Sequence, residues 1–170
     1  MITITESEMN FGPFAEDDCL ELEKCSTYFR IKNGVKVAEF AVIRQHRGMP
    51  VIWIVEAKSS APKHTNKDDF PGYIREIKQK LLNSILMLIA GKLNRHADWG
   101  HNLPASFNSL TYSEDFKLVL VVNNHDSDWL PPLQDALNIE LMPVVKTFGL
   151  QPNSVAVIND QMARRFRLIV

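Results

Sequence analysis

Residues Val51–Lys58 read VIWIVEAK and form the most informative segment of the chain. The segment is apolar along most of its length, as expected of a central strand that is covered on both faces. Charged residues, Glu56 and Lys58, enter only at its end. Residues two apart on a strand point to the same face, so these two side chains should project together. The segment therefore predicts a buried strand that ends in a polar site.

Two further strands are expected before this segment. Thr27–Ile31 is β-branched and aromatic, and the Asn33-Gly34 pair that follows it is a strong hairpin signal. The pattern predicts that Val35–Arg44 pairs back on Thr27–Ile31 as an antiparallel hairpin. Gly48 and Pro50 then mark a turn into Val51–Lys58.

The chain after Lys58 alternates helices and strands. A polar loop at Ser59–Asp69 precedes a long helix from Pro71 to about Asn94, in which apolar residues recur at helical spacing. The remaining elements are expected as an irregular stretch at 95–115, a strand at Phe116–Val122, a short helix at Pro132–Leu141, a short strand at Val155–Ile158 and a closing helix at Asp160–Phe166. This order predicts an α/β sandwich with a central mixed sheet flanked by helices, in one domain over residues 1–170.

Composition excludes several classes of protein. The longest apolar run, Leu81–Leu93, contains polar interruptions and is too short to span a bilayer. The N-terminus lacks a basic segment followed by an apolar stretch, so no secretory signal is expected. Two cysteines, Cys19 and Cys25, cannot build a disulfide framework, and no Cys/His set surrounds them to hold zinc. These features predict a cytoplasmic protein with no membrane partner.

The net charge of −1 conceals an uneven distribution. Residues 1–24 carry seven acidic residues against one lysine, whereas residues 25–100 carry 13 basic residues against six acidic ones. A basic middle segment is compatible with a polyanionic partner such as nucleic acid. A solvated surface of mixed charge is the alternative interpretation.

Charged residues inside strands that otherwise look buried are the candidate functional groups. Glu39 interrupts VKVAEFAVI, and Glu56 and Lys58 end VIWIVEAK. An unpaired charge in a sheet interior is costly, so something must offset its burial. One arrangement is a structural Glu56–Lys58 pair at the rim of the sheet. The other is a divalent cation held by Glu39 and Glu56, with Lys58 beside a bound water.

These residues resemble the PD-(D/E)XK, or restriction endonuclease-like, nuclease superfamily. The shared features are a hairpin strand with an acid, an apolar strand that ends in Glu-x-Lys, here Glu56-Ala57-Lys58, and a long helix after it. The first acid would be Glu39, 17 residues before Glu56, in Ala38-Glu39 where the superfamily often has Pro-Asp. The resemblance covers Thr27 to Val122, more than half of the chain, and implies a restriction endonuclease-like sandwich.

The resemblance implies phosphodiester hydrolysis in DNA or RNA with Mg²⁺, or Mn²⁺ in its place. Glu39, Glu56 and the carbonyl of Ala57 would coordinate the ion, and Lys58 would orient or help deprotonate the attacking water. Little chain lies outside the core, so target selection would need a basic surface, a homodimer or a partner protein. The alternative function is a catalytically inactive binding or assembly subunit, which the altered first motif and the near-neutral charge favour.

Two further residues are candidates for the same site. The resemblance suggests an additional metal-binding acid before the hairpin, and Glu23 is the candidate, with an exposed acidic edge as the alternative. It also suggests that Lys80 from the long helix approaches the phosphate or Glu56. Glu76, Lys80 and Ser84 are spaced four apart along that helix, so they could equally form a solvated face with a Glu76–Lys80 pair.

Overall fold

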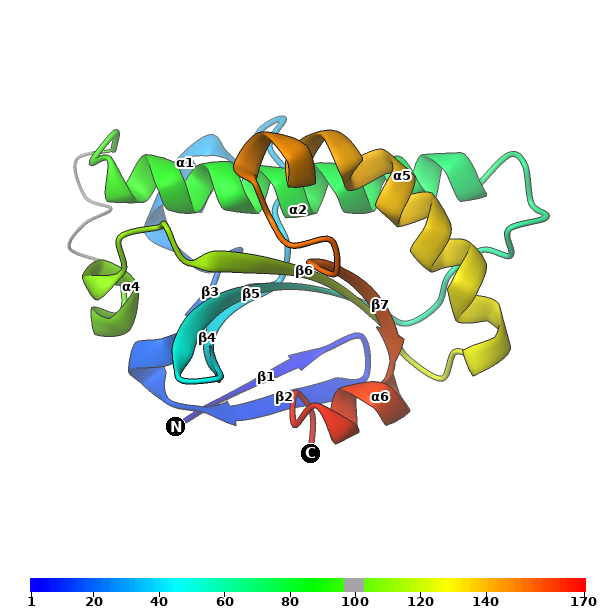
Figure 1. The fold of residues 1–170 in the computed structure, drawn as a ribbon, viewed down its shortest axis with the longest axis horizontal. Helices are drawn as coiled ribbons and strands as arrows, with labels where there is room; N and C mark the ends of the chain where they lie inside the picture. Colours follow the sequence, from blue (N-terminus) through cyan, green and yellow to red (C-terminus); the bar gives the residue numbers. More distant parts are fainter. Residues whose placement is uncertain (97–102) are drawn as a thin grey trace.

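The computed structural model describes residues 1–96 and 103–170. The fold is centred on a five-stranded mixed sheet that has other elements packed on both faces (Figure 1). The strand order is β3-β4-β5-β6-β7. The strands are β3 (Cys19–Glu21), β4 (Phe40–His46), β5 (Met49–Lys58), β6 (Asp115–Val122) and β7 (Val155–Asn159). β4 runs antiparallel to both of its neighbours, whereas β5, β6 and β7 are parallel. The predicted α/β class with a central mixed sheet is confirmed.

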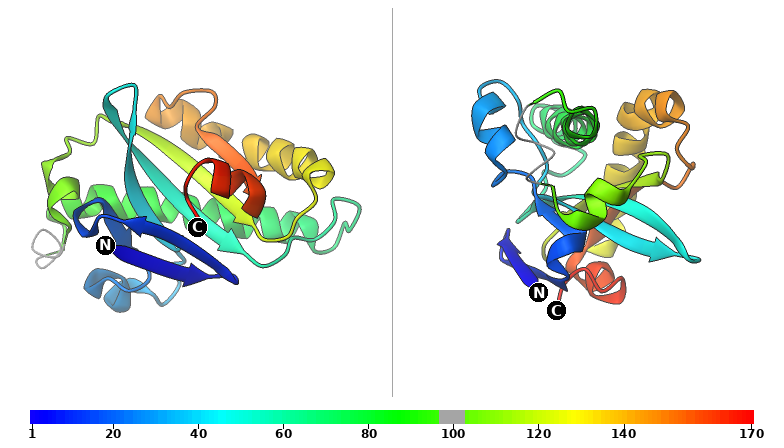
Figure 2. Two further views of the ribbon diagram at one scale, coloured as in Figure 1. Left: turned by 90° about the horizontal axis from the view of Figure 1, so that it is seen from below. Right: turned by 90° about the vertical axis from the view of Figure 1, so that its left-hand side faces the viewer.

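Helices α1 (Ser26–Ile31), α2 (Phe70–Lys92) and α5 (Leu130–Phe148) lie on one face of this sheet (Figures 1 and 2). Successive side chains of a strand point to opposite faces, so the sheet contributes to a hydrophobic core on each side. On β5, Ile52 and Ile54 pack with the helices, whereas Val55 and Ala57 pack on the opposite side. The short helix α4 (Ala105–Ser109) adds Phe107 to the helix-side core.

The opposite face is covered by a hairpin of β1 (Ile2–Glu6) and β2 (Met9–Phe14), together with α6 (Asp160–Arg165) (Figure 2). Phe11 from this hairpin packs edge-on against Phe40 of the sheet, with ring centroids 5.1 Å apart. Two 3₁₀ turns, η1 (Glu16–Asp18) and η2 (Ser127–Trp129), complete the elements described. Sequence reasoning did not predict the β1–β2 hairpin.

The hairpin predicted from Thr27–Ile31 and the Asn33-Gly34 pair is wrong. Those five residues belong to helix α1, and the chain from Val35 to Glu39 runs without regular structure before β4 begins at Phe40. The residues of α1 that face the core are Thr27, Tyr28 and Ile31, whereas Phe29 and Arg30 are exposed. This spacing of buried and exposed residues is typical of a helix. In so short a run, β propensity does not separate a strand from a helix.

β4 pairs antiparallel with β3 on one side and with β5 on the other, and β5 follows β4 through the two-residue turn Arg47-Gly48. The other predicted elements are present with small shifts of their ends. Helix α5 is longer than predicted because it begins at Leu130 and continues through Pro143 to Phe148. The next residue, Gly149, caps the helix with a φ of 62°, the left-handed conformation that favours glycine. The stretch expected to be irregular, 95–115, contains α4, and its residues 97–102 lie outside the described part. Among the described helices, none is long and apolar enough to cross a bilayer.

Candidate functional site

The site is built on the last residues of β5. Glu56 and Lys58 lie on the helix side of the sheet, on the same face as Ile52 and Ile54, and beneath α2. Their side chains project together as predicted, with Lys58 Nζ 2.9 Å from Glu56 Oε1. The Glu56 side chain is fully buried, while a quarter of the Lys58 side chain stays exposed.

Glu39 reaches the same place from the neighbouring segment. It precedes β4 rather than lying within it, yet its N–H donates to the Val55 carbonyl at 3.1 Å and its carbonyl accepts from the Leu22 N–H at 3.0 Å. These two bonds continue the sheet by one position beyond β4. Because Phe40 lies opposite Val55, Glu39 is beside Glu56.

Lys80, from the middle of α2, lies among the carboxylates of three different segments. Its Nζ is 2.9 Å from Glu56 Oε1, 3.4 Å from Glu39 Oε1 and 3.6 Å from Glu23 Oε1. It also donates a hydrogen bond to Glu56 Oε2 at 3.2 Å. The structure thus brings Glu23, Glu39, Glu56, Lys58 and Lys80 together. The interpretation of Lys80 as part of a solvated helix face is wrong, since only 8% of the residue is exposed.

In the Glu76–Lys80–Ser84 stripe of α2, Lys80 and Ser84 are buried against the sheet, whereas 40% of the Glu76 side chain is exposed. Ser84 Oγ is buried, accepts from the Ala38 N–H at 2.8 Å and donates to the Lys80 carbonyl at 2.7 Å. Glu76 pairs with Lys36 at 2.9 Å and with Lys58 at 3.6 Å, instead of with Lys80. The ion pairs therefore form one chain from Lys36 on the surface to Glu56 in the interior.

Burial dominates the electrostatics of the two central carboxylates. Burial and the neighbouring Glu56 charge raise the pKa of Glu39 to about 7, although Lys80 opposes the shift. Burial also raises the pKa of Glu56, against the opposing charges of Lys80 and Lys58. Burial alone would lower the pKa of Lys80, but the surrounding carboxylates raise it above its ordinary value. Lys80 is therefore held as an ammonium ion, whereas Glu39 changes charge near neutral pH.

Two buried oxygen atoms of the site lack a hydrogen bond from the described residues, Glu56 Oε1 and the Tyr73 hydroxyl. Oε1 lies 2.9 Å from both Lys58 Nζ and Lys80 Nζ, so its contacts are ionic ones without hydrogen-bond geometry. Burial raises the pKa of Tyr73, and the charges of Glu56 and Glu76 raise it further. Glu56 Oε1 is thus paired with two ammonium groups.

The donor chemistry of the site suits a hard divalent cation. Carboxylate and carbonyl oxygens are the ligands that Mg²⁺ prefers. Carbonyls alternate along a strand, so the Ala57 carbonyl is directed to the same side of β5 as that of Val55, which accepts from Glu39. Within residues 1–96 and 103–170, however, no group of three His, Cys, Asp or Glu side chains is arranged to hold a metal. In this structure the cation that Glu23, Glu39 and Glu56 share is the Lys80 ammonium.

Sequence reasoning missed the outer part of the cluster. The local sequence does not indicate that Lys36 and Tyr73 lie at the cluster, or that Glu76 pairs with Lys58. These contacts join residues that are far apart in the chain, so no local pattern predicts them. Glu21, two residues before Glu23, does not join the cluster but pairs with Lys24 at 2.5 Å. β3 ends at Glu21, so strict alternation does not continue to Glu23.

The fold and the site together define a mixed α/β protein with a buried Glu–Lys cluster at the carboxyl end of its central strand. In comparisons with known proteins, no protein family, no curated protein and no solved structure matches the chain.

Proposed function

We propose that this protein is a Mg²⁺-dependent nuclease with a restriction endonuclease-like fold, and that Glu39, Glu56 and Lys58 form its active site. The observation that carries the proposal is the fully buried Glu56 carboxylate, which lies among Lys58, Lys80 and Glu39 although these come from three separate segments. Burying several charges costs free energy that a structural role does not require. Such clusters of perturbed ionisable groups are typical of functional sites.

The order of elements supports the proposal. The chain has an acid immediately before β4, then a Glu-x-Lys motif at the end of β5, the long helix α2 and strand β6. This is the order of the superfamily that the sequence resembles. The two motif acids, 17 positions apart in sequence, meet because β4 and β5 are adjacent antiparallel strands.

Each residue has a role that follows from its place. Glu39 and Glu56, with the Ala57 carbonyl, would hold Mg²⁺, and Glu23 is the outermost acid available to it. A bound Mg²⁺ would lower the pKa of a water molecule and offset negative charge on the phosphate. Lys58 is the ammonium group nearest to solvent among those that contact Glu56, so it can orient the attacking water. Lys80, when released from the carboxylates, would be free to contact a phosphate.

A second candidate function is a binding or assembly subunit that keeps this fold without catalysis. The observation that favours it is the Lys80 ammonium, which lies 3.4 Å from Glu39 and 2.9 Å from Glu56 and is placed to neutralise them itself. In that case the cluster would be a structural ion-pair network, and its loss would affect stability alone.

A cleavage assay with matched variants separates the two functions. Labelled single-stranded DNA, duplex DNA and RNA are incubated with wild type, Glu56→Gln and Lys58→Ala in Mg²⁺. Glu140→Gln is the control, because it removes another lysine-paired glutamate, the partner of Lys78 on the helix surface. We expect both site variants to lose cleavage while remaining folded and the control to retain it. Equal cleavage by all four proteins would contradict the nuclease proposal.

A further inference from the structure

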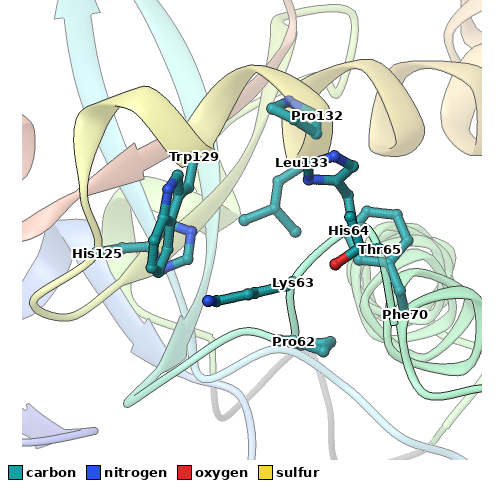
Figure 3. A pocket seen from close by; sticks show the side chains of 9 residues that line it. All are labelled: Pro62, Lys63, His64, Thr65, Phe70, His125, Trp129, Pro132 and Leu133. Atoms are coloured by element: carbon teal, nitrogen blue, oxygen red, sulfur yellow. The ribbon is translucent and has the colours of Figure 1, made fainter. Parts of the chain in front are cut away.

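A pocket of about 260 Å³ lies at the edge of the sheet where the parallel strands end (Figure 3). Its lining comes from the loop after β5, from the segment after β6, and from the first turns of α2 and α5. Because β5 and β6 are parallel, the segments that follow them meet at the same edge of the sheet. Open α/β sheets commonly bind ligands at this edge.

The pocket is close to the Glu–Lys cluster in the chain. Its first lining residue, Pro62, is four residues after Lys58, which limits their separation to about 14 Å. On the adjoining strand, the Asn123 N–H donates to the Lys58 carbonyl at 2.9 Å, and His125 of the pocket follows two residues later. A ligand that extends from the pocket can therefore reach Lys58.

One wall of the pocket is an aromatic surface with a cation above it. Trp129 is 48% exposed, which is unusual for so large an apolar side chain. Lys63 Nζ lies 4.8 Å from the centroid of the Trp129 indole ring. The His125 ring packs edge-on against the same indole, with ring centroids 5.8 Å apart. In Figure 3, Lys63 extends toward this Trp129–His125 pair, and His64 and Phe70 lie across the pocket from it.

The chemistry of this wall matches a nucleotide. A flat exposed indole offers a stacking surface to a nucleobase, and an adjacent lysine offers an ammonium to its phosphate. Burial lowers the pKa of His125, so its ring is neutral at neutral pH and can both donate and accept a hydrogen bond. The volume is at the lower end for small-molecule sites and suits one ring system rather than a base pair.

We propose that this pocket binds an unpaired nucleobase, stacked on Trp129 in the place of the Lys63 ammonium, and that Lys63 then contacts the neighbouring phosphate. A base inside a duplex is not available for such stacking. The pocket therefore selects single-stranded nucleic acid. That this strand is the substrate of the Glu56 cluster rests on the proposed nuclease function, whereas the binding itself does not.

The test is equilibrium binding of fluorescein-labelled single-stranded oligonucleotides and a matched duplex, followed by fluorescence anisotropy in the presence of chelator. We expect Trp129→Ala to weaken single-strand binding about tenfold and Trp129→Phe to restore most of it. The matched control is Phe29→Ala, because Phe29 is an exposed aromatic residue with Lys32 Nζ 5.3 Å from its ring, outside this pocket. That control should bind like wild type.

Lys63→Ala provides a second readout. Losing one phosphate contact should lower the slope of log affinity against log salt by about 0.7 for a single strand. The inference would be overturned by any of three results: no single-strand binding by folded wild type, unchanged binding by Trp129→Ala, or tighter binding of the duplex that does not depend on Trp129.

The two proposals can fail separately. Trp129-dependent binding without cleavage by the wild type in Mg²⁺ would overturn the nuclease function and leave the pocket standing. Cleavage that requires Glu56, with single-strand binding unaffected by Trp129→Ala, would overturn the pocket proposal and leave the nuclease function standing.

Discussion

Lys80 neutralises more buried negative charge than any other residue for which ion pairs are described in the site. Its ammonium contacts Glu39 and Glu56, whose side chains are 11% and 0% exposed, and Glu23, whose side chain is 42% exposed. Burial strengthens the first two contacts and raises the free-energy cost of leaving either carboxylate unpaired. The neighbouring Lys78 is also paired, with Glu140 at 2.8 Å, but about a third of each of these side chains is exposed. The two lysines therefore differ in burial while they share a helix.

Replacing Lys80 by methionine should lower the free energy of unfolding by about 3 kcal/mol or more, because it leaves Glu56 buried beside Glu39 with one cation fewer. The control Lys78→Met should cost about 0–1 kcal/mol, as exposed ion pairs do. Urea denaturation at neutral pH without divalent cations measures both. Equal losses in the two variants would contradict the account of Lys80.

Glu39 makes stability depend on pH. Its pKa is about 7 in the folded protein and 4.5 ordinarily, so between these values the folded state binds a proton that the unfolded state releases. The free energy of unfolding should therefore fall as pH rises from about 4.5 to 7, by about 3 kcal/mol from this group.

Denaturation of wild type and Glu39→Gln across this pH range in chelator isolates the contribution of Glu39. We expect the variant to gain stability relative to wild type as pH rises, since glutamine does not ionise. A stability difference that stays constant from pH 5 to 8 would contradict the raised pKa. Glu140→Gln is measured alongside as the control glutamate outside the cluster.

At the scale of elements, one buried serine fixes α2 to the segment that carries Glu39. Ser84 Oγ accepts the Ala38 N–H and donates to the Lys80 carbonyl, so it ties the helix to the chain one residue before Glu39. Asn83, the residue before Ser84 on α2, donates an exposed hydrogen bond to the Lys36 carbonyl at 2.8 Å.

Ser84→Ala should cost about 1–3 kcal/mol, because the buried Ala38 N–H loses its partner. Asn83→Ala should cost less, since water can replace its hydrogen bond. Thermal unfolding of both variants measures the difference, and cleavage should fall in Ser84→Ala alone, since Ser84 positions Glu39 and Lys80. A larger loss of stability in Asn83→Ala would contradict this role.

The β1–β2 turn and the Asn33-Gly34 pair show why some elements could not be predicted. The β1–β2 turn is made by Ser7 and Glu8, both with positive φ, in place of the Asn-Gly pair that usually signals such a turn. Asn33-Gly34 carries that signal, yet it follows helix α1 and joins no hairpin. Turn residues indicate only the local conformation that the backbone prefers. Which segments pair as strands depends on the apolar faces that the rest of the chain must cover.

The centre of the site was predictable for a different reason. Alternation along an apolar strand placed Glu56 and Lys58 on one face, and adjacency of the preceding strand brought in Glu39. The burial of Lys80 was not predictable. When one face of a helix carries both polar and apolar residues, tertiary packing determines which of them are buried. Sequence reasoning named Lys80 only through the resemblance.

At the scale of the whole molecule, each face of the sheet carries charges of both signs. The acidic residues 1–24 include the β1–β2 hairpin on one face, but α6 on that same face carries Arg164 and Arg165 (Figure 2). The basic residues 25–100 include α2 on the other face, where the acids Glu39 and Glu56 also lie. The Glu–Lys cluster and the loop that carries Lys63 both lie on this helix side.

Titration with Mg²⁺ by isothermal calorimetry tests the central claim most directly, because the carboxylates must exchange Lys80 for a divalent cation. Wild type, Glu56→Gln and the control Glu140→Gln are compared at pH 8, where Glu39 is ionised. The account predicts saturable binding to wild type and to the control, and its loss in Glu56→Gln. A folded wild type that binds no Mg²⁺, or that binds it equally well without Glu56, would contradict the account.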